Sequence, residues 1–116
     1  MIERLRTRAQ FLFVRRGKKA VRPAVIVEAR RRAPDGPAGA GFTATAKIGG
    51  AVVRNRARRR LREAVRALLP RHGLPGVDYV FVARAQTPDA PWPALLDDVG
   101  NALISVRAEL GADRPA

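Results

Sequence analysis

The sequence predicts an α+β fold, an α-β sandwich in which helices pack on one face of a mixed sheet of about four strands. Two observations support this fold class: short β-branched runs alternate with longer stretches of helical periodicity, and no linker is long enough to divide the 116 residues. A chain of this length can bury a hydrophobic core without cross-links. It contains no cysteine, which excludes disulfides and zinc–thiolate sites. We therefore expect a single domain over residues 1–116.

The first predicted element is a helix over residues 5–16, which ends before Gly17. Its apolar residues point in two directions, because Phe11 and Val14 lie away from the side that carries Leu5. One direction is expected to pack on the core and the other to line a groove. Whether Phe11 belongs to the groove or to the core stays open on this pattern alone.

Two strands are predicted next. A basic linker over residues 18–22 leads to a β-branched run at residues 23–29, which predicts the first strand. Residues 30–40 contain Pro-Asp-Gly-Pro and predict a turn. Residues 41–45 form the second strand, whose alternation sends its phenylalanine and alanine to one face and its two threonines to the other. Residues 47–50 then leave the sheet through a pair of glycines.

A long basic helix follows, around which the rest of the chain is organised, and it is predicted to stop near Pro70. Its apolar residues recur at spacings of three and four and form one stripe, comprising Ala57, Leu61, Ala64, Val65, Leu68 and Leu69. The opposite face and its flanks carry arginines, namely Arg56, Arg59, Arg60, Arg62 and Arg66. Like charges one helical turn apart cost about 0.2–0.5 kcal/mol per pair. A polyanion would neutralise them, and arginine suits phosphate because its planar fork donates two parallel hydrogen bonds.

Two further elements complete the predicted domain. Residues 77–83 are apolar on both faces of a strand, so this strand should be central in the sheet. After a proline-containing loop, a last helix carries an apolar seam from Leu96 to Leu110. Asp97 and Asp98 are expected in its first turn, where they suit the helix dipole. Residues 111–116 are expected to fray.

Charge divides the chain into two unequal parts. The net charge is +13, and residues 1–71 carry 20 Lys and Arg against four acids, whereas residues 72–116 carry three against six. Such polarisation predicts a nucleic-acid partner on one side of the molecule. The alternatives are a solvated basic face and a membrane-surface protein, whose amphipathic helix would carry bulkier apolar residues than this alanine-rich stripe. No apolar run of membrane length or secretion signal is visible, so a cytoplasmic location is expected.

The sequence shows no self-sufficient active site. His72 is the only histidine, and it is expected in a solvent-exposed turn. Asp97 and Asp98 are neighbours in sequence and therefore diverge by about 100° on a helix. A nuclease or other hydrolase would show clustered carboxylates, a metal set, or a nucleophile with its base. If the chain belongs to an enzyme, another component must bring the chemistry.

A longer pattern begins in the second strand and runs into the basic helix. It reads GFT at residues 41–43, KIGGAVVRNR at 47–56, RR at 58–59 and LRE at 61–63. This pattern resembles the signature of the bacterial ribonuclease P protein subunit. The likeness also includes the opening residues 4–12 and the last strand and helix, so it covers nearly the whole chain.

The resemblance implies a small basic protein that assists a ribozyme in removing 5′ leaders from precursor transfer RNA. In that family the catalyst is the RNA subunit with its bound magnesium ions, so no cofactor is expected on the protein alone and Mg²⁺ is expected through the RNA. The implied partners are the ribonuclease P RNA and precursor transfer RNA, with no membrane and a monomeric free protein. The family fold contains a left-handed crossover, which pattern alone would not predict because such connections are right-handed in roughly 98% of cases.

Two functional surfaces are implied by matching this sequence to the family pattern. The face that contacts the catalytic RNA falls on Lys47, Arg54, Asn55, Arg56, Arg58, Arg59 and Arg62. The helical wheel agrees for the arginines at 56, 59 and 62, whereas those at 54 and 58 lie nearer the apolar stripe. The cleft for the single-stranded leader lies between the first helix and the sheet and falls on Phe11, Val14 and Arg15. The aromatic residue usual one turn after Phe11 is missing, so leader contacts are expected to depend more on charge.

Two other classes of protein remain as alternatives. A structural RNA-binding protein of ribosomal type would share the charge but would have no effect on leader cleavage. A helix-based DNA-binding module would need a helix that reaches base edges in the major groove. Asn55 within an arginine-rich helix can imitate such a helix, but the sequence shows no helix-turn-helix spacing and no dimerisation seam.

Overall fold

One mixed sheet forms the centre of the molecule in the computed structural model, which describes residues 2–112. Within these residues five strands pair in the order β1-β4-β5-β3-β2. The strands are β1 (Ile2–Arg4), β2 (Lys18–Arg22), β3 (Val25–Arg31), β4 (Ala38–Thr43) and β5 (Val77–Ala83). The helices are α1 (Arg8–Arg15), α2 (Ala51–His72) and α3 (Trp92–Ala112), with a 3₁₀ turn at Ala46–Ile48 before α2. The predicted α+β sandwich is confirmed.

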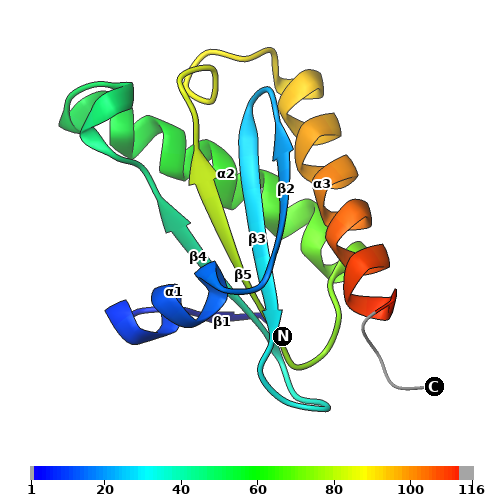
Figure 1. Cartoon of the computed structure of the whole chain (residues 1–116). Coiled ribbons are helices and arrows are strands. Elements are labelled where there is room, and N and C mark those ends of the chain that lie inside the picture. Colours follow the sequence, from blue (N-terminus) through cyan, green and yellow to red (C-terminus); the bar gives the residue numbers. More distant parts are fainter. Residues whose placement is uncertain (1, 113–116) are drawn as a thin grey trace.

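The sheet has a different hydrophobic cluster on each face (Figure 1). The two long helices, α2 and α3, cover one face, where Tyr79 and Phe81 belong to the large core. The short α1 lies on the opposite face, where Leu5, Val14 and Val80 form a smaller cluster. Strand β5 supplies side chains to both clusters and lies between β4 and β3. The prediction of a central strand at residues 77–83 is therefore confirmed.

The connection between β4 and β5 has the hand that the family resemblance implied. These strands are parallel neighbours, in register from Gly39 opposite Asp78 to Thr43 opposite Val82, and α2 connects them. Figure 1 shows both strands pointing up, with α2 behind the sheet and β5 to the right of β4. A path that passes behind two upward strands and returns on the right is a left-handed crossover, against the usual preference.

Helix α2 begins after a glycine turn and continues through a proline. Gly49 has φ of 144°, a conformation that L side chains rarely adopt. The predicted stripe is confirmed, since it is buried at Ala57, Leu61, Ala64, Val65 and Leu69 and half-buried at Leu68. The helix ends close to the predicted position, since it continues past Pro70 only to His72 and is capped by Gly73. His72 therefore lies half-buried in the last helical turn and not in an exposed loop.

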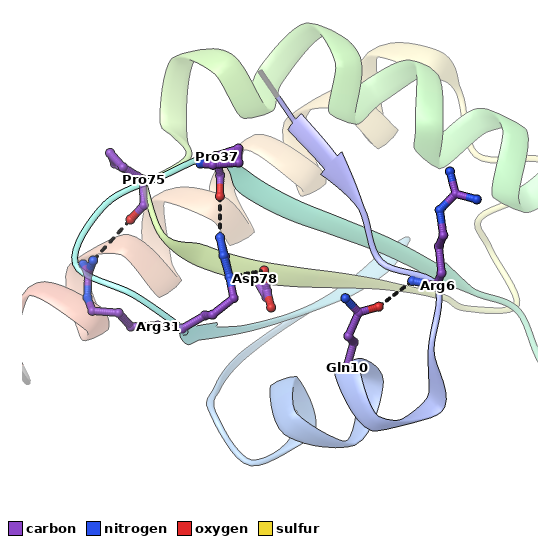
Figure 2. Close-up of polar contacts among 7 residues, drawn as sticks. Arg6, Gln10, Arg31, Pro37, Pro75 and Asp78 are labelled. Carbon is purple, nitrogen blue, oxygen red and sulfur yellow. Dashed lines mark hydrogen bonds and ion pairs between the residues drawn. The ribbon is translucent and has the colours of Figure 1, made fainter.

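The N-terminal segment differs most from the prediction. Residues 2–4 form β1, which pairs in parallel with β4, and Leu5 precedes the helix instead of belonging to it. Thr7 caps α1, since its Oγ1 accepts a hydrogen bond from the Gln10 N–H at 3.3 Å. The Gln10 Oε1 accepts from the N–H group of Arg6 at 2.7 Å (Figure 2). It also accepts from the N–H group of Thr7 at 2.9 Å. This capping box fixes where α1 begins, and its Thr-x-x-Gln pattern is visible in the sequence.

Strand β2 occupies the segment predicted as a basic linker. It pairs antiparallel with β3 at the edge of the sheet, with Ala20 buried and Val21 exposed. Charged residues on an edge strand protect it from pairing with other chains. In β2 they also leave too few apolar residues for the alternation of buried and exposed side chains to be visible in the sequence. The neighbouring strands are also longer than predicted, so the turn between β3 and β4 spans residues 32–37 and not 30–40. Residues 47–50 leave the sheet as predicted, since they fall in the 3₁₀ turn and the glycines between it and α2.

Helix α3 starts before the end of the predicted loop, so Asp97 and Asp98 do not lie in its first turn. Asp98 instead accepts a hydrogen bond from the Ala24 N–H at 2.8 Å and ties the helix to the start of β3. The apolar seam is buried at Leu95, Val99, Ala102, Leu103, Val106 and Leu110, whereas Leu96, where the predicted seam begins, is only half-buried against the same core. The fraying predicted for residues 111–116 lies outside the described residues from position 113 onward, and the helix includes the two positions before it.

A buried carboxylate lies at the start of β5. Asp78 is 4% exposed, and its Oδ1 lies 3.4 Å from the Nε of Arg32 (Figure 2). The same arginine donates a hydrogen bond to the carbonyl oxygen of Pro37 at 2.5 Å, so it connects the 32–37 turn to the sheet. Burial raises the pKa of Asp78 above its ordinary value, an effect that Arg32 opposes and Glu3 reinforces.

The raised pKa of Asp78 predicts a pH dependence of stability. The folded state holds the Asp78 proton more tightly than the unfolded chain does, so this contribution is fully present below the ordinary aspartate pKa and is lost as pH rises through the raised one. Replacing Asp78 with asparagine should flatten this part of the stability profile, measured by urea unfolding from acidic to neutral pH. The exposed Asp35→Asn is the matched control and should keep the wild-type profile. An unchanged profile in Asp78→Asn would contradict the assignment.

Candidate nucleic-acid interface

The polar surface of α2 divides into two sides with different partners. On the side near the β5–α3 connection, Arg60 donates hydrogen bonds to the carbonyl oxygens of Thr87 at 2.7 Å and Ala90 at 2.5 Å. Arg56 donates through its Nε to the carbonyl oxygen of Pro88 at 2.9 Å. These two arginines hold the connection against the helix. Arg60 therefore has a structural role, whereas Arg56 keeps 54% of its side chain exposed for a further contact.

The other side of α2, together with the turn before it, carries the cations that are free to bind a partner. Arg59 is exposed and Arg62 is half-buried, and neither makes a hydrogen bond or ion pair with residues 2–112. Arg58 donates to the Oδ1 of Asn55 at 2.6 Å, which orients both side chains on the helix surface. Lys47 is exposed in the 3₁₀ turn that precedes the helix. We call this set of five residues the free side of α2.

Arg54 has a different environment from the other predicted RNA contacts. It is half-buried in the first turns of α2, and its Nε is buried without a hydrogen-bond partner in the part of the chain that the structure describes. A buried donor without an acceptor costs about 1–3 kcal/mol. The position near the apolar stripe explains this burial, so Arg54 can meet a partner only from the edge of the helix.

A groove of about 470 Å³ lies between α1 and the sheet. Apolar side chains line it at Phe11, Leu12, Ile26, Val80 and Val82. Polar and charged side chains complete the lining at Arg8, Arg15, Lys19, Glu28, Thr43 and Thr45. The two threonines point to this face, as the predicted alternation of their strand requires, while Phe42 and Ala44 pack against the large core. The groove thus combines an apolar surface with three cations, which suits single-stranded nucleic acid.

Two of the three residues predicted for the leader cleft line this groove. Phe11 is half-buried there, and Arg15 is exposed beside it. Val14 is 0% exposed and packs with Leu5 and Val80, so it belongs to the core and cannot contact a ligand. Helix α1 is shorter than the predicted helix over residues 5–16, and Val14 is the only one of its residues that is buried against the sheet. Phe11, left open between groove and core on the sequence pattern, lines the groove.

A second hollow, of about 430 Å³, adjoins the groove at Phe11, which lines both. Its other lining residues come from the N-terminal segment, β4 and α2, and are Arg4, Leu5, Arg6, Phe42, Arg58 and Arg62. Figure 2 shows the Arg6 side chain extending toward α2. The groove beneath α1 and the free side of α2 are therefore parts of one basic surface. Arg4 and Arg6 were not predicted, because their placement depends on the unpredicted strand β1.

The described residues offer donors for binding and no arrangement typical of a metal centre. No three His, Cys, Asp or Glu side chains between positions 2 and 112 converge as a set of metal ligands. None of the helices in that part of the chain has the length and apolar character that crossing a membrane requires. The chemistry that the site supports is the neutralisation and positioning of an anionic chain.

A sheet with an arginine-rich crossover helix on one face and a cation-lined groove on the other defines a small protein that fits an extended polyanion. The Ribonuclease P family model matches residues 2–107. The chain is 54% identical over 109 residues to the ribonuclease P protein component of Caulobacter vibrioides, covering 93% of this chain and 73% of the relative. It is 44% identical over 107 residues to that of Ruegeria pomeroyi, covering 90% and 86%. The chain belongs to the ribonuclease P protein component family, and the resemblance seen in the sequence is confirmed.

Solved structures agree with this assignment. The ribonuclease P protein from Thermotoga maritima superimposes with a TM-score of 0.76 at 26% identity, covering 90% of this chain and 97% of that one. The ribonuclease P protein of Staphylococcus aureus gives a TM-score of 0.71 at 22% identity, covering 86% and 91%, and supports the fold. The family is that of a protein component of a tRNA-processing ribonucleoprotein.

Proposed function

We propose that this chain binds the catalytic RNA of ribonuclease P through the free side of α2 and the 5′ leader of precursor tRNA through the groove beneath α1. The observation that carries this proposal is the division of the arginines. Those facing the β5–α3 connection hold the fold together, whereas Arg59 and Arg62 are unpaired among the described residues. Because the free side joins the groove at Phe11, one RNA surface and one single strand can be bound side by side.

Within this proposal the protein supplies positive charge, and the RNA subunit with its bound Mg²⁺ carries out the hydrolysis, as the family resemblance implies. Each phosphate neutralised by arginine or lysine releases condensed counterions and reduces the repulsion between the RNA subunit and its anionic substrate. The protein should therefore matter most when magnesium is scarce. We expect the free protein to be a monomer that binds no metal of its own and acts in the cytoplasm.

Reconstitution tests this function. Purified protein is mixed with a bacterial ribonuclease P RNA and a leader-bearing precursor tRNA at low magnesium and near-physiological salt, and 5′ cleavage is measured. We expect protein-dependent cleavage at the mature 5′ end and no cleavage by the protein alone. Binding of RNA without any stimulation of cleavage would favour a structural RNA-binding protein of ribosomal type. Cleavage by the protein alone would refute the assignment of catalysis to the RNA.

Replacing Phe11 with alanine should weaken binding of precursor tRNA more than binding of mature tRNA. Phe11 lines both the groove and the adjoining hollow, and stacking of one base on an aromatic ring contributes about 1–3 kcal/mol. Dissociation constants of the two tRNAs from the reconstituted complex measure the difference. Ile104→Ala, which removes an exposed apolar side chain from α3, is the matched control. Equal losses for both tRNAs would assign Phe11 to packing alone.

A further inference from the structure

A single carboxylate stands out among the described residues that line the groove beneath α1. Glu28 lies in β3, directly opposite Val80 of β5 and Lys19 of β2, and its residue is 8% exposed. Its Oε2 is 3.9 Å from the Lys19 Nζ, too long for a hydrogen bond. No residue in the described part of the chain donates a hydrogen bond to this carboxylate, which faces the groove with unused acceptor capacity.

The groove separates into parts that suit different pieces of a nucleotide. Three cations, Arg8, Arg15 and Lys19, attract phosphates. The carboxylate of Glu28 repels them, so a strand bound here should turn a base toward Glu28. Ile26 lies two residues before Glu28 in β3, and Val82 lies opposite Ile26 in β5. Both side chains line the same groove. They provide the apolar surface on which the face of a base can lie.

The chemistry of a carboxylate restricts which base can occupy that position. An ionised glutamate only accepts hydrogen bonds. Adenine, cytosine and guanine carry an exocyclic amino group that can donate to it. Guanine is the best match, because its N1–H and amino group present two parallel donors to the two carboxylate oxygens. Uracil has one N–H between two carbonyl oxygens, which would face the carboxylate oxygens at close range.

We propose that Glu28 selects one nucleotide of the bound leader, accepting a hydrogen bond from the amino group of its base, with guanine preferred and uracil disfavoured. This inference rests on the proposed function of the groove and adds to it a residue that determines specificity. The Lys19 side chain across the β2–β3 pair lies 3.9 Å from the carboxylate, too far for a hydrogen bond, and leaves its oxygens available to the base.

A leader scan tests the proposal in the reconstituted ribonucleoprotein. Precursor tRNAs carry G, A, C or U at one leader position at a time, and relative kcat/KM values are measured by competition. At one position we expect guanine to be favoured over uracil by roughly tenfold, the scale of a good paired contact to a base edge. Glu28→Gln, whose amide both donates and accepts, should reduce this ratio to within about twofold. Loss of the negative charge should also raise kcat/KM for all leaders by the same factor. This common factor cancels in the ratio between guanine and uracil leaders.

Glu109→Gln is the matched control, because it makes the same charge change at an exposed position on α3, across the sheet from the groove. It should leave every ratio unchanged. A wild-type protein with no leader position that distinguishes guanine from uracil overturns the proposal, whether or not Glu28→Gln folds. So does a Glu28→Gln protein that retains the wild-type ratio. Absence of any protein-stimulated cleavage would instead refute the proposed function itself, and this inference with it.

Discussion

The Arg59→Ala, Arg62→Ala double variant is expected to bind the ribonuclease P RNA more weakly and with a flatter dependence on salt. Each lost phosphate contact reduces the slope of log K against log salt concentration by about 0.7–0.9, so two contacts reduce it by roughly 1.4–1.8. Neither guanidinium makes a hydrogen bond or ion pair with the described fold. The free energy of unfolding should therefore change by no more than about 0.5 kcal/mol.

Filter binding across a series of salt concentrations gives this slope, and urea unfolding reports the stability of the same preparations. Arg107→Ala is the control for loss of a positive charge elsewhere. It lies on α3, where its NH1 reaches the His72 carbonyl oxygen only at 3.4 Å. The control should keep the wild-type slope. If the double variant also keeps it, the free side of α2 is not part of the RNA interface.

Arg60→Met is expected to have the opposite profile, with a loss of stability of about 2 kcal/mol. The substitution removes two charged hydrogen bonds to the carbonyl oxygens of Thr87 and Ala90, and bonds of this kind contribute about 1.5–3 kcal/mol when buried. Both are partly buried, so the lower end of that range applies. Methionine retains an apolar stem near Trp92, whose ring centre lies 5.8 Å from the Arg60 guanidinium.

Urea unfolding measures this effect, with Arg59→Met as the matched control one position earlier on the same helix. Arg59 is exposed, so its replacement should change stability by no more than about 0.5 kcal/mol. RNA binding should respond in the reverse order, with the larger loss for Arg59→Met. A fully stable Arg60→Met protein would show that the β5–α3 connection does not depend on this arginine. Arg60 would then be available for RNA binding.

Sequence pattern predicted the elements whose buried face repeats over several turns or residues. Strand β5 was predicted with its observed bounds, and the buried stripe of α2 was predicted almost completely. Strands β1 and β2 were missed because they are short, lie at the edges of the sheet and are rich in charged residues. An edge strand buries too few side chains for its alternation to be visible. Because β1 was not predicted, the first helix was extended back to Leu5. Val14 was then assigned to the groove, whereas it packs in the core with Leu5 and Val80.

The candidate site was less predictable than the fold for a related reason. A helical wheel shows which arginines face away from the core, but not which of them meet a segment distant in sequence. Arg56 and Arg60 bond to carbonyl groups 27 to 32 positions later, and only the tertiary structure places those groups beside α2. The role of the remaining residues in RNA binding stays a prediction. For Arg59 and Arg62, the structure adds that neither makes a hydrogen bond or ion pair with residues 2–112.

The strand order has a consequence for how the chain folds. Among the described strands, β2 and β3 are the only sheet neighbours joined by a short turn, so their hairpin can form early and alone. The parallel pairs β1–β4 and β4–β5 must first close the intervening segments 5–37 and 44–76. Closing such long loops costs entropy before any pairing contributes, which slows folding. Because α2 lies within the second of these segments, we expect the arginine surface to reach its final shape only after the hairpin has formed.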